Sequence, residues 1–195
     1  KYTSYNFNAM AYVPSYIAYG SSTVTAQTYD VYLGKWSSLY YAIRETNEAL
    51  NYLHTYGQMG DDDKPRLEGE IRLVRAFLYF ELVKRYKDVI IYDEDLGAIT
   101  KDKAIDTEEK AWDFIQSDLD YAAANLPERA AAGGRMDKGM AYGLASRAML
   151  YAGRYDAVVS AAEAVAALGY SLESNYADAF GKSLAAGNRE AILQY

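Results

Sequence analysis

The chain has 195 residues, of which 27 are acidic and 20 are basic, with no cysteine, one histidine and 21 tyrosines. The lack of cysteine excludes disulfides and cysteine-bound zinc, and a single histidine excludes multi-histidine metal sites and leaves little room for a Ser-His-Asp triad. A net charge of −7 argues against a nucleic-acid partner, which needs clustered Lys and Arg.

Residues 1–34 show no helical period and are rich in Tyr, Ser, Thr and Gly, which is typical of irregular structure with short turns. Residues 35–195 carry helical periodicity, so we expect an irregular Tyr-rich segment followed by one helical domain. The chain opens without an apolar leader, contains no run of 18 apolar residues and stops in the short apolar run 191–195. We therefore expect a fragment that is cut at both ends.

The first two expected helices are long. The first covers about 34–56 and has a stripe that also includes Asn47; its apolar members are Trp36, Leu39, Tyr40, Ile43, Leu50 and Leu53. The second begins with Asp63 as its N-cap and runs to about Tyr86. Its apolar face is predicted to consist of Leu67, Ile71, Val74, Phe77, Leu78 and Leu82.

The later expected elements are shorter. A brief extended run covers 89–92. Thr107 is expected to cap a third helix that ends at Leu126. The apolar stripe of this helix consists of Trp112, Ile115, Leu119 and Ala122 or Ala123. Two further helices are expected over about 138–152 and 155–168, each followed by a glycine, and a short one near 176–180. This order predicts an all-α fold with short loops.

Residues 140–169 have the pattern of a helix–turn–helix repeat. Small residues occupy both helices, and the stretch from Gly153 to Asp156 supplies the turn. Small side chains let helix axes come close, as in tetratricopeptide-type pairs, although Val158 stands where Ala is usual. The pattern favours tetratricopeptide-like helix pairs that stack into a scaffold.

Several segments, taken in order, resemble the SusD/RagB family of nutrient-binding lipoproteins from Bacteroidetes outer membranes. The resemblance is carried by Trp36 to Leu50, Glu70 to Tyr86, Trp112 to Pro127, Lys138 to Gly153, Gly169 to Leu172, Tyr176 to Phe180 and Asn188 to Leu193. The stretch Glu70 to Tyr86 contains Arg75-Ala76-Phe77, which is similar to the family's RAF motif. The sequence departs from the family at 87–90, where Lys-Asp-Val-Ile replaces the usual Gly-Asp-Val-Pro.

This resemblance implies a SusD-like α–α superhelix that forms the N-terminal portion of a longer protein. It implies a non-enzymatic subunit, without cofactor or metal, that captures glycans, oligosaccharides or peptides at the cell surface. A SusC-like TonB-dependent transporter is the implied partner. The implied location is the outer membrane, reached through a lipid anchor that is absent from this chain.

Three polar residues within the helices, Asn47, Arg75 and Asp118, are interpreted as structural. Arg75 lies among apolar residues and is costly to bury unless it is paired, so an ion pair with Glu70, Asp118 or Asp120 is expected. Asn47 is interpreted in the same way, as a hydrogen-bonded interior amide that fixes the register of its helix.

The acidic runs 61–63 and 93–95 lack the alternate spacing of a calcium loop, so solvated loops are expected there. His54 lies at a helix end, where surface exposure or capping is more common than chemistry. No P-loop, GxSxG or HExxH motif occurs, so an enzyme such as a glycan hydrolase ranks last among the possible functions.

The tyrosines divide into two sets. Tyr40, Tyr79, Tyr86, Tyr151 and Tyr155 fall in or beside the helix motifs and are expected to serve packing. The second set is a group of ligand candidates near the junction between the irregular segment and the first helix, because sugars offer C–H faces to aromatic rings and hydroxyls to acids. The candidates are Tyr16, Tyr19, Tyr29, Asp30, Tyr32 and Trp36. Trp36 is also a candidate for the core. The alternative function is a generic helical-repeat scaffold that binds a peptide or protein.

Overall fold

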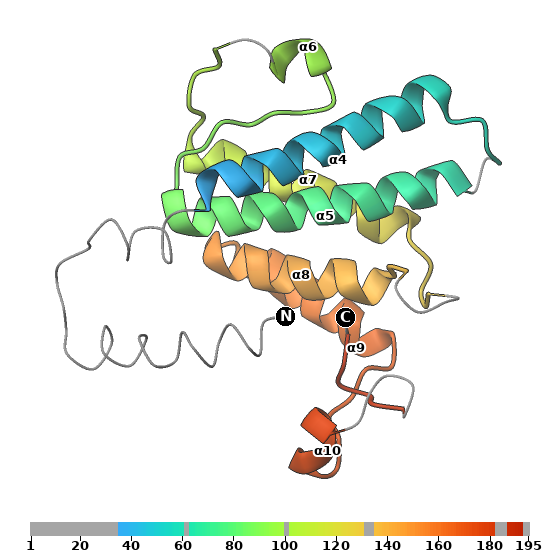
Figure 1. Cartoon of the computed structure of the whole chain (residues 1–195). Coiled ribbons are helices and arrows are strands. Elements are labelled where there is room, and N and C mark those ends of the chain that lie inside the picture. Colours follow the sequence, from blue (N-terminus) through green and yellow to red (C-terminus); the bar gives the residue numbers. More distant parts are fainter. Residues whose placement is uncertain (1–34, 61–62, 100–101, 131–134, 182–186, 193–195) are drawn as a thin grey trace, which may run out of the picture. The chain divides into compact units, whose positions relative to one another are not determined.

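The computed structural model describes residues 35–60, 63–99, 102–130, 135–181 and 187–192 (Figure 1). The chain divides after Ser37, and the unit from Ser38 to Tyr195 holds almost all of the described residues. The predicted irregular segment 1–34 lies outside the described residues.

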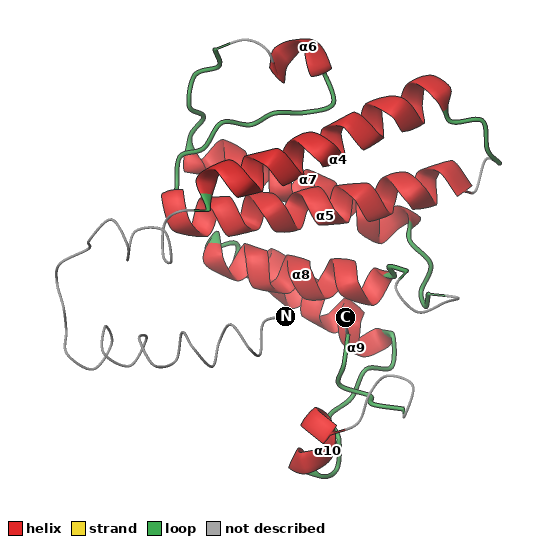
Figure 2. Ribbon diagram, in the orientation of Figure 1, coloured by secondary structure: helices red, strands yellow, loops and turns green. Residues whose placement is uncertain are grey.

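The described residues form helices joined by loops, and they contain no strand (Figure 2). The helices are α4 (Trp36–Tyr56), α5 (Asp63–Tyr86), α6 (Leu96–Ile99), α7 (Glu108–Asn125), α8 (Lys138–Tyr151), α9 (Tyr155–Ala167) and α10 (Tyr176–Gly181). An antiparallel bridge pairs Val89 with Asp106, and Val89 begins the brief extended run that the sequence predicted. The all-α prediction is confirmed.

The helices pack in sequence order. α5 packs along α7, α7 along α8, and α8 forms a hairpin with α9, while α5 also touches α8. Side-chain hydrogen bonds tie α4 to α5 and to the loop before α6. Figure 1 shows α4, α5 and α8 lying side by side in this unit. Residues of α7, α8 and α9 together line a pocket.

The helix ends follow local chemistry. Thr107 caps α7 by accepting a hydrogen bond from the Lys110 amide, and Asp137 caps α8 by accepting from the Met140 amide at 3.1 Å. Gly153 and Gly169 follow α8 and α9 with φ of 71° and 82°, a left-handed conformation that glycine adopts at little cost. Lys87 follows α5 with φ of 61°, so the position where the family usually has glycine does adopt the conformation that favours glycine.

The buried faces of α4 and α7 match the sequence analysis. On α4, Ile43, Asn47, Leu50 and Leu53 are buried, whereas Trp36, Leu39 and Tyr40 are only partly covered. On α7 the whole predicted stripe is buried, together with Asp118. Both helices turn toward the core the face on which their apolar residues recur with the helical period of 3.6, as amphipathic helices do.

The predicted apolar face of α5 is wrong. Of the six residues assigned to it only Leu82 is buried, and Phe77 is 48% exposed. The buried side of α5 instead carries Gly69, Leu73, Arg75, Ala76, Tyr79, Phe80, Leu82 and Val83, with Glu68 at its start. Apolar residues occur all around this helix, so its pattern does not select a face, and packing against α7 and the hydrogen bonds of Arg75 and Tyr79 decide which side turns inward.

Candidate functional site

Arg75 stands at the centre of a buried network of charged and polar side chains. Arg75 and Asp118 are each 1% exposed, and the guanidinium donates two hydrogen bonds to the Asp118 carboxylate, at 2.7 and 2.8 Å. A third nitrogen donates to Asn47 Oδ1 and to Glu94 Oε2, both at 2.8 Å. The pairing is bidentate, and this geometry favours burial of the two charges together.

The structure selects one of the three partners considered for Arg75. Asp118 takes that role, whereas Glu70 pairs with Arg66 and Arg135 at the surface, and Asp120 has no partner in the described part of the chain. Asn47 uses both ends of its amide, since its Nδ2 donates to the Tyr92 carbonyl at 3.0 Å. These contacts join α4, α5 and α7 through three side chains.

A second arginine extends the network toward the end of α4. Arg72 donates to Glu68 at 2.7 Å and to Asp118 at 3.0 Å, and Glu68 in turn contacts His54 Nε2 at 2.9 Å. His54 therefore pairs with a carboxylate instead of capping its helix. Burial alone would raise the pKa of Glu68, but its hydrogen bonds with His54 and Arg72 outweigh burial and lower the pKa.

The loop acid Glu94 also belongs to this network, which corrects the prediction that 93–95 is a solvated loop. Its carboxylate accepts from Arg75, so although burial alone would raise the pKa of Glu94, the arginine lowers it. Burial would likewise lower the pKa of Arg75, and its bonds with Asp118 and Glu94 raise it instead. The lowered pKa values of Glu68 and Glu94 and the raised pKa of Arg75 favour the charged forms of these groups, and their mutual hydrogen bonds hold the helices together.

Two tyrosine hydroxyls fix the loop that contains Glu94. Tyr79 Oη accepts from the Tyr92 amide at 2.7 Å and donates to the Tyr92 carbonyl at 3.0 Å. Tyr40 Oη makes the same pair of bonds with Ile90, at 2.7 and 2.9 Å. Burial raises the pKa of Tyr40 to about 12, so the hydroxyl keeps its proton for the bond to the carbonyl. The two side chains satisfy backbone groups that have no strand partner.

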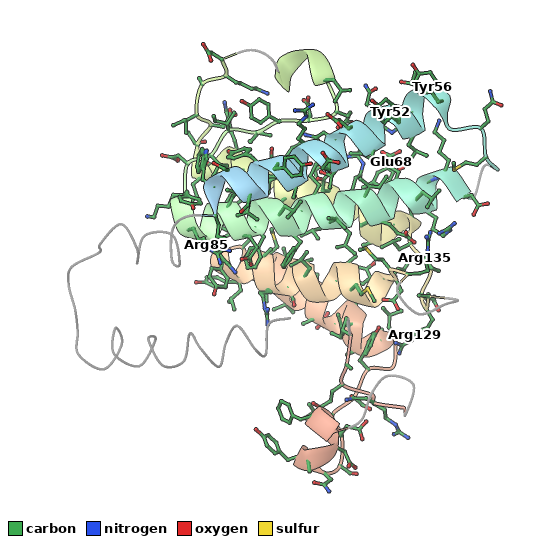
Figure 3. All side chains as sticks on the ribbon, in the orientation of Figure 1. Tyr52, Tyr56, Glu68, Arg85, Arg129 and Arg135 are labelled. Carbon is green, nitrogen blue, oxygen red and sulfur yellow. The ribbon has the colours of Figure 1, made fainter. Side chains whose placement is uncertain are left out.

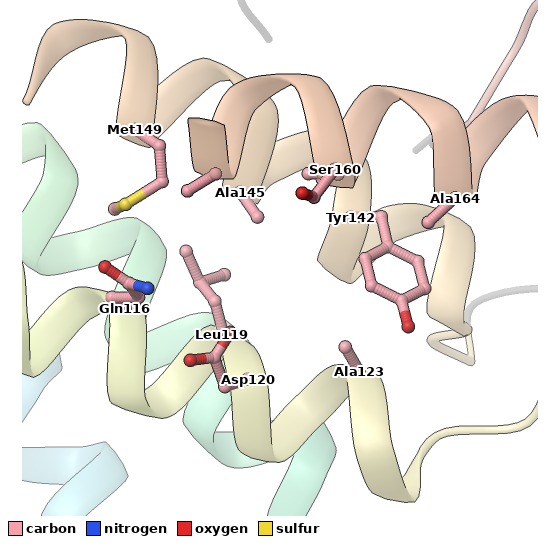
Figure 4. Close-up of a pocket in the computed structure, with 11 residues that line it drawn as sticks. Gln116, Leu119, Asp120, Ala123, Tyr142, Ala145, Met149, Ser160 and Ala164 are labelled. Atoms are coloured by element: carbon pink, nitrogen blue, oxygen red, sulfur yellow. The ribbon is translucent and has the colours of Figure 1, made fainter. Parts of the chain in front are cut away.

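A separate hollow lies between α7, α8 and α9 and has a volume of about 450 Å³ (Figure 4). Alanines on all three helices leave this space, because their side chains are too short to fill it. The lining residues are Gln116, Leu119, Asp120, Ala123, Tyr142, Ala145, Met149, Ala157, Ser160, Ala161 and Ala164. Leu119 and Met149 are buried and give the pocket an apolar base.

Four polar side chains line this pocket. Asp120 on α7 and Tyr142 on α8 have no hydrogen-bond or ion-pair partner within the described residues, and both appear at the hollow in Figure 4. Gln116 accepts from Arg154 at 2.6 Å, and the Ser160 hydroxyl donates to the Asp156 carbonyl at 3.0 Å. Burial raises the pKa of Asp120. The pocket therefore offers carboxylate, phenol, amide and hydroxyl groups beside an apolar surface.

The structure describes only one of the ligand candidates from the sequence, Trp36, and Trp36 does not line this pocket. Tyr16, Tyr19, Tyr29, Asp30 and Tyr32 lie outside the described residues, and Trp36 begins α4 as a partly buried side chain. From the sequence alone, the small residues of 140–169 predict only a close approach of two helices. Those same alanines are the signal that marks the pocket, together with Asp120 on the neighbouring helix.

Two tyrosines assigned to packing are mostly exposed. Tyr151 still places its ring edge against Phe80, with the ring centroids 5.3 Å apart, but Tyr155 is exposed at the start of α9. Tyr52 and Tyr56 form another exposed pair on α4 (Figure 3). Tyr79, by contrast, is completely buried, as predicted.

Among the described residues, no three histidine or acidic side chains come together in a way that could hold a metal ion. None of the helices in the described ranges has the length and apolar character needed to cross a membrane. The described pocket contains one acid, Asp120.

Stacked helix pairs with a pocket lined by mixed polar groups define a helical-repeat binding protein. The family model of SusD-like proteins, described as starch-binding and associating with the outer membrane, matches residues 2–150. The chain therefore belongs to the SusD-like family of carbohydrate-binding proteins. A SusD-like protein of Bacteroides ovatus is 29% identical to it over 120 residues, which are 60% of this chain and 21% of that protein.

Solved structures agree with this assignment. A SusD-like protein of Bacteroides fragilis is 36% identical and superposes with a TM-score of 0.64 over 70% of this chain and 27% of its own. A structure determined with a xylogluco-oligosaccharide is 26% identical, with a TM-score of 0.69 over 82% of this chain and 34% of its own. The tetratricopeptide-like fold is thereby confirmed. The chain spans about a third or less of the length of these relatives.

Proposed function

We propose that the protein is a non-catalytic glycan-binding subunit at the cell surface that passes oligosaccharides to a TonB-dependent transporter of the outer membrane. The observation that carries this proposal is the family match, which extends over residues 2–150. The structural relative determined with a xylogluco-oligosaccharide supports a glycan as the ligand class. The lipid anchor that would hold the protein at the surface belongs to the same proposal.

The pocket between α7, α8 and α9 supports binding over catalysis. Glycoside hydrolysis by most known mechanisms uses two carboxyl groups that flank the scissile bond. Among the described residues, Asp120 is the single acid that lines this pocket, and the nearby acids Asp113 and Asp118 are both engaged by arginines. A carboxylate without a second acid is suited to accept hydrogen bonds from hydroxyl groups.

Isothermal titration calorimetry of the 195-residue chain tests glycan binding. Malto-oligosaccharides follow from the starch-binding description of the family, and xylogluco-oligosaccharides follow from the structural relative. We expect saturable binding of at least one of the two and no release of reducing ends on prolonged incubation. Absence of binding to both would contradict the proposal, and release of reducing ends would contradict the non-catalytic part.

The transporter partnership needs a different measurement. The full-length protein, carrying an affinity tag, should co-purify an outer-membrane β-barrel from detergent-solubilised membranes, and a tagged protein of another helical-repeat family should not. Recovery of the protein without any barrel would contradict the partnership while leaving glycan binding in place.

A second candidate function is a scaffold that binds a protein or peptide. The observation that favours it is a group of exposed apolar side chains after α9, where Leu172, Tyr176 and Phe180 are 86%, 82% and 77% exposed. Exposed apolar patches commonly mark protein contacts. Binding of an extended or helical peptide together with a blank glycan titration would favour the scaffold.

A further inference from the structure

We propose that the pocket between α7, α8 and α9 binds one sugar ring of a glycan, with the Asp120 carboxylate accepting hydrogen bonds from ring hydroxyls and Tyr142 contacting the ring. This inference rests on the proposed function and assigns a site to it. The described residues that line the pocket are not among those proposed from the sequence for ligand binding.

The size of the pocket fits a small polar ligand. Its volume of about 450 Å³ falls within the range of roughly 300–1,000 Å³ that is usual for small-molecule sites. The wall is built from helices that pack against each other, with Leu119 and Ala161 buried beneath it. A ligand would meet a surface that is already formed, which lowers the entropy lost on binding.

Asp120 is an acid of α7 without a partner among the described residues. The two aspartates that precede it on α7 are satisfied, since Asp113 pairs with Arg154 and Asp118 pairs with Arg75. Asp120 lines the pocket as a solvent-exposed side chain, and the partial loss of water around it raises its pKa. Its carboxylate can therefore accept hydrogen bonds from a ligand in place of water.

The remaining polar groups distinguish a sugar from a cation. A cationic ligand would be satisfied by Asp120 alone. The pocket also presents the Tyr142 hydroxyl, which can donate and accept, the Ser160 oxygen, which can still accept, and the Gln116 amide. Mixed donors and acceptors around an aromatic ring match a molecule that carries several hydroxyls on an apolar ring of C–H groups.

The test is a set of variants of the 195-residue chain, titrated with malto- and xylogluco-oligosaccharides. Ala164→Leu places a larger side chain in the pocket from α9, and Ala162→Leu places the same side chain at an exposed position of the same helix as its control. We expect Ala164→Leu to weaken binding at least tenfold and Ala162→Leu to leave it within twofold. Equal melting temperatures for the two variants would show that the loss is not caused by unfolding.

Substitutions of the polar groups sharpen the assignment. Asp120→Ala should weaken binding about tenfold, the effect of losing one hydrogen bond to a charged group. Tyr142→Phe keeps the ring and should weaken binding only a few fold, whereas Tyr142→Ala should weaken it more. Glu163→Gln, a change of an exposed acid on α9, serves as the control and should change nothing.

The outcomes separate the two proposals. If the unmodified chain binds and neither Ala164→Leu nor Asp120→Ala weakens binding, the pocket assignment is overturned and the proposed function stands. If the unmodified chain binds none of the oligosaccharides, both are overturned. If it binds an amine or guanidinium compound in an Asp120-dependent manner but no oligosaccharide, the pocket is a cation site and the sugar assignment is wrong.

Discussion

The α4–α5–α7 part of the molecule and the α8–α9–α10 part are stabilised in different ways. The first buries large and polar side chains, among them Arg75, Tyr79, Phe80 and Asp118, and the buried polar atoms of the described residues all have hydrogen-bond partners. The second buries mainly small side chains such as Ala141, Ala148 and Ala161, and it leaves many of its larger apolar side chains exposed.

The difference indicates a division of roles. A buried and fully paired network fixes one arrangement of helices, because any other arrangement leaves a charge without its partner. Contacts between small residues fix the distance between helices but leave space and exposed surface around them. The first part therefore acts as the support, and the second part carries the exposed apolar patch and, together with α7, lines the pocket.

The largest expected effect is the loss of the buried ion pair. Asp118→Ala leaves Arg75 buried without its bidentate partner and should lower the free energy of unfolding by about 3–5 kcal/mol. Asp120→Ala, two residues away on the same helix, removes an acid without a partner and should change stability by less than about 0.5 kcal/mol. Urea denaturation of both variants checks this. Similar losses in the two would show that the network does not dominate the stability of the first part.

The tyrosines give the next comparison. Tyr79→Phe removes a buried hydroxyl that holds both the amide and the carbonyl of Tyr92, and it should cost about 1–3 kcal/mol because those groups lose their partner. Tyr155→Phe removes an exposed hydroxyl and should cost almost nothing. Hydrogen exchange should also become faster at the Tyr92 amide in the first variant only. An unchanged exchange rate would contradict the role assigned to the hydroxyl.

These residues also show what the sequence could and could not predict. The stripes of α4 and α7 were found because each helix has one apolar face, and the need of Arg75 for a partner followed from its neighbours. The buried face of α5 was missed because apolar residues surround that helix, so tertiary contacts decided its orientation.

Features that depend on distant parts of the chain escaped the sequence analysis. Glu94 reaches Arg75 across 19 residues because two tyrosine hydroxyls hold its loop in place, and no local pattern reports such a contact. The pocket escaped for a similar reason, since it arises from alanines on helices that meet only in the folded chain. The ligand candidates in 16–32 stay a prediction, because they lie outside the described residues.

Substitutions at the helix ends should change stability by a smaller amount, with a gain in the first part and a loss in the second. Lys87 follows α5 with φ of 61°, whereas Gly153 follows α8 with φ of 71°. A side chain in this conformation costs about 1 kcal/mol relative to glycine, so Lys87→Gly should raise stability by about 0.5–1 kcal/mol and Gly153→Ala should lower it by about 1 kcal/mol. Thermal unfolding measures both, and a loss of stability in Lys87→Gly would show that its side chain makes a compensating contact.

The smallest expected effect is a pH dependence confined to the first part. The pKa of Glu94 is lowered in the folded chain, where Arg75 outweighs burial, so its contribution to stability is complete above its unfolded pKa and is lost as the pH falls through the folded pKa. Glu94→Gln should therefore lose less stability than the unmodified chain between pH 6 and about pH 3.5. The difference should be a few tenths of a kcal/mol, since Glu94 is partly in contact with solvent. Glu163→Gln on α9 is the control and should lose as much stability on acidification as the unmodified chain. If both variants lose equally less stability, the acid sensitivity comes from overall charge and not from the network around Arg75.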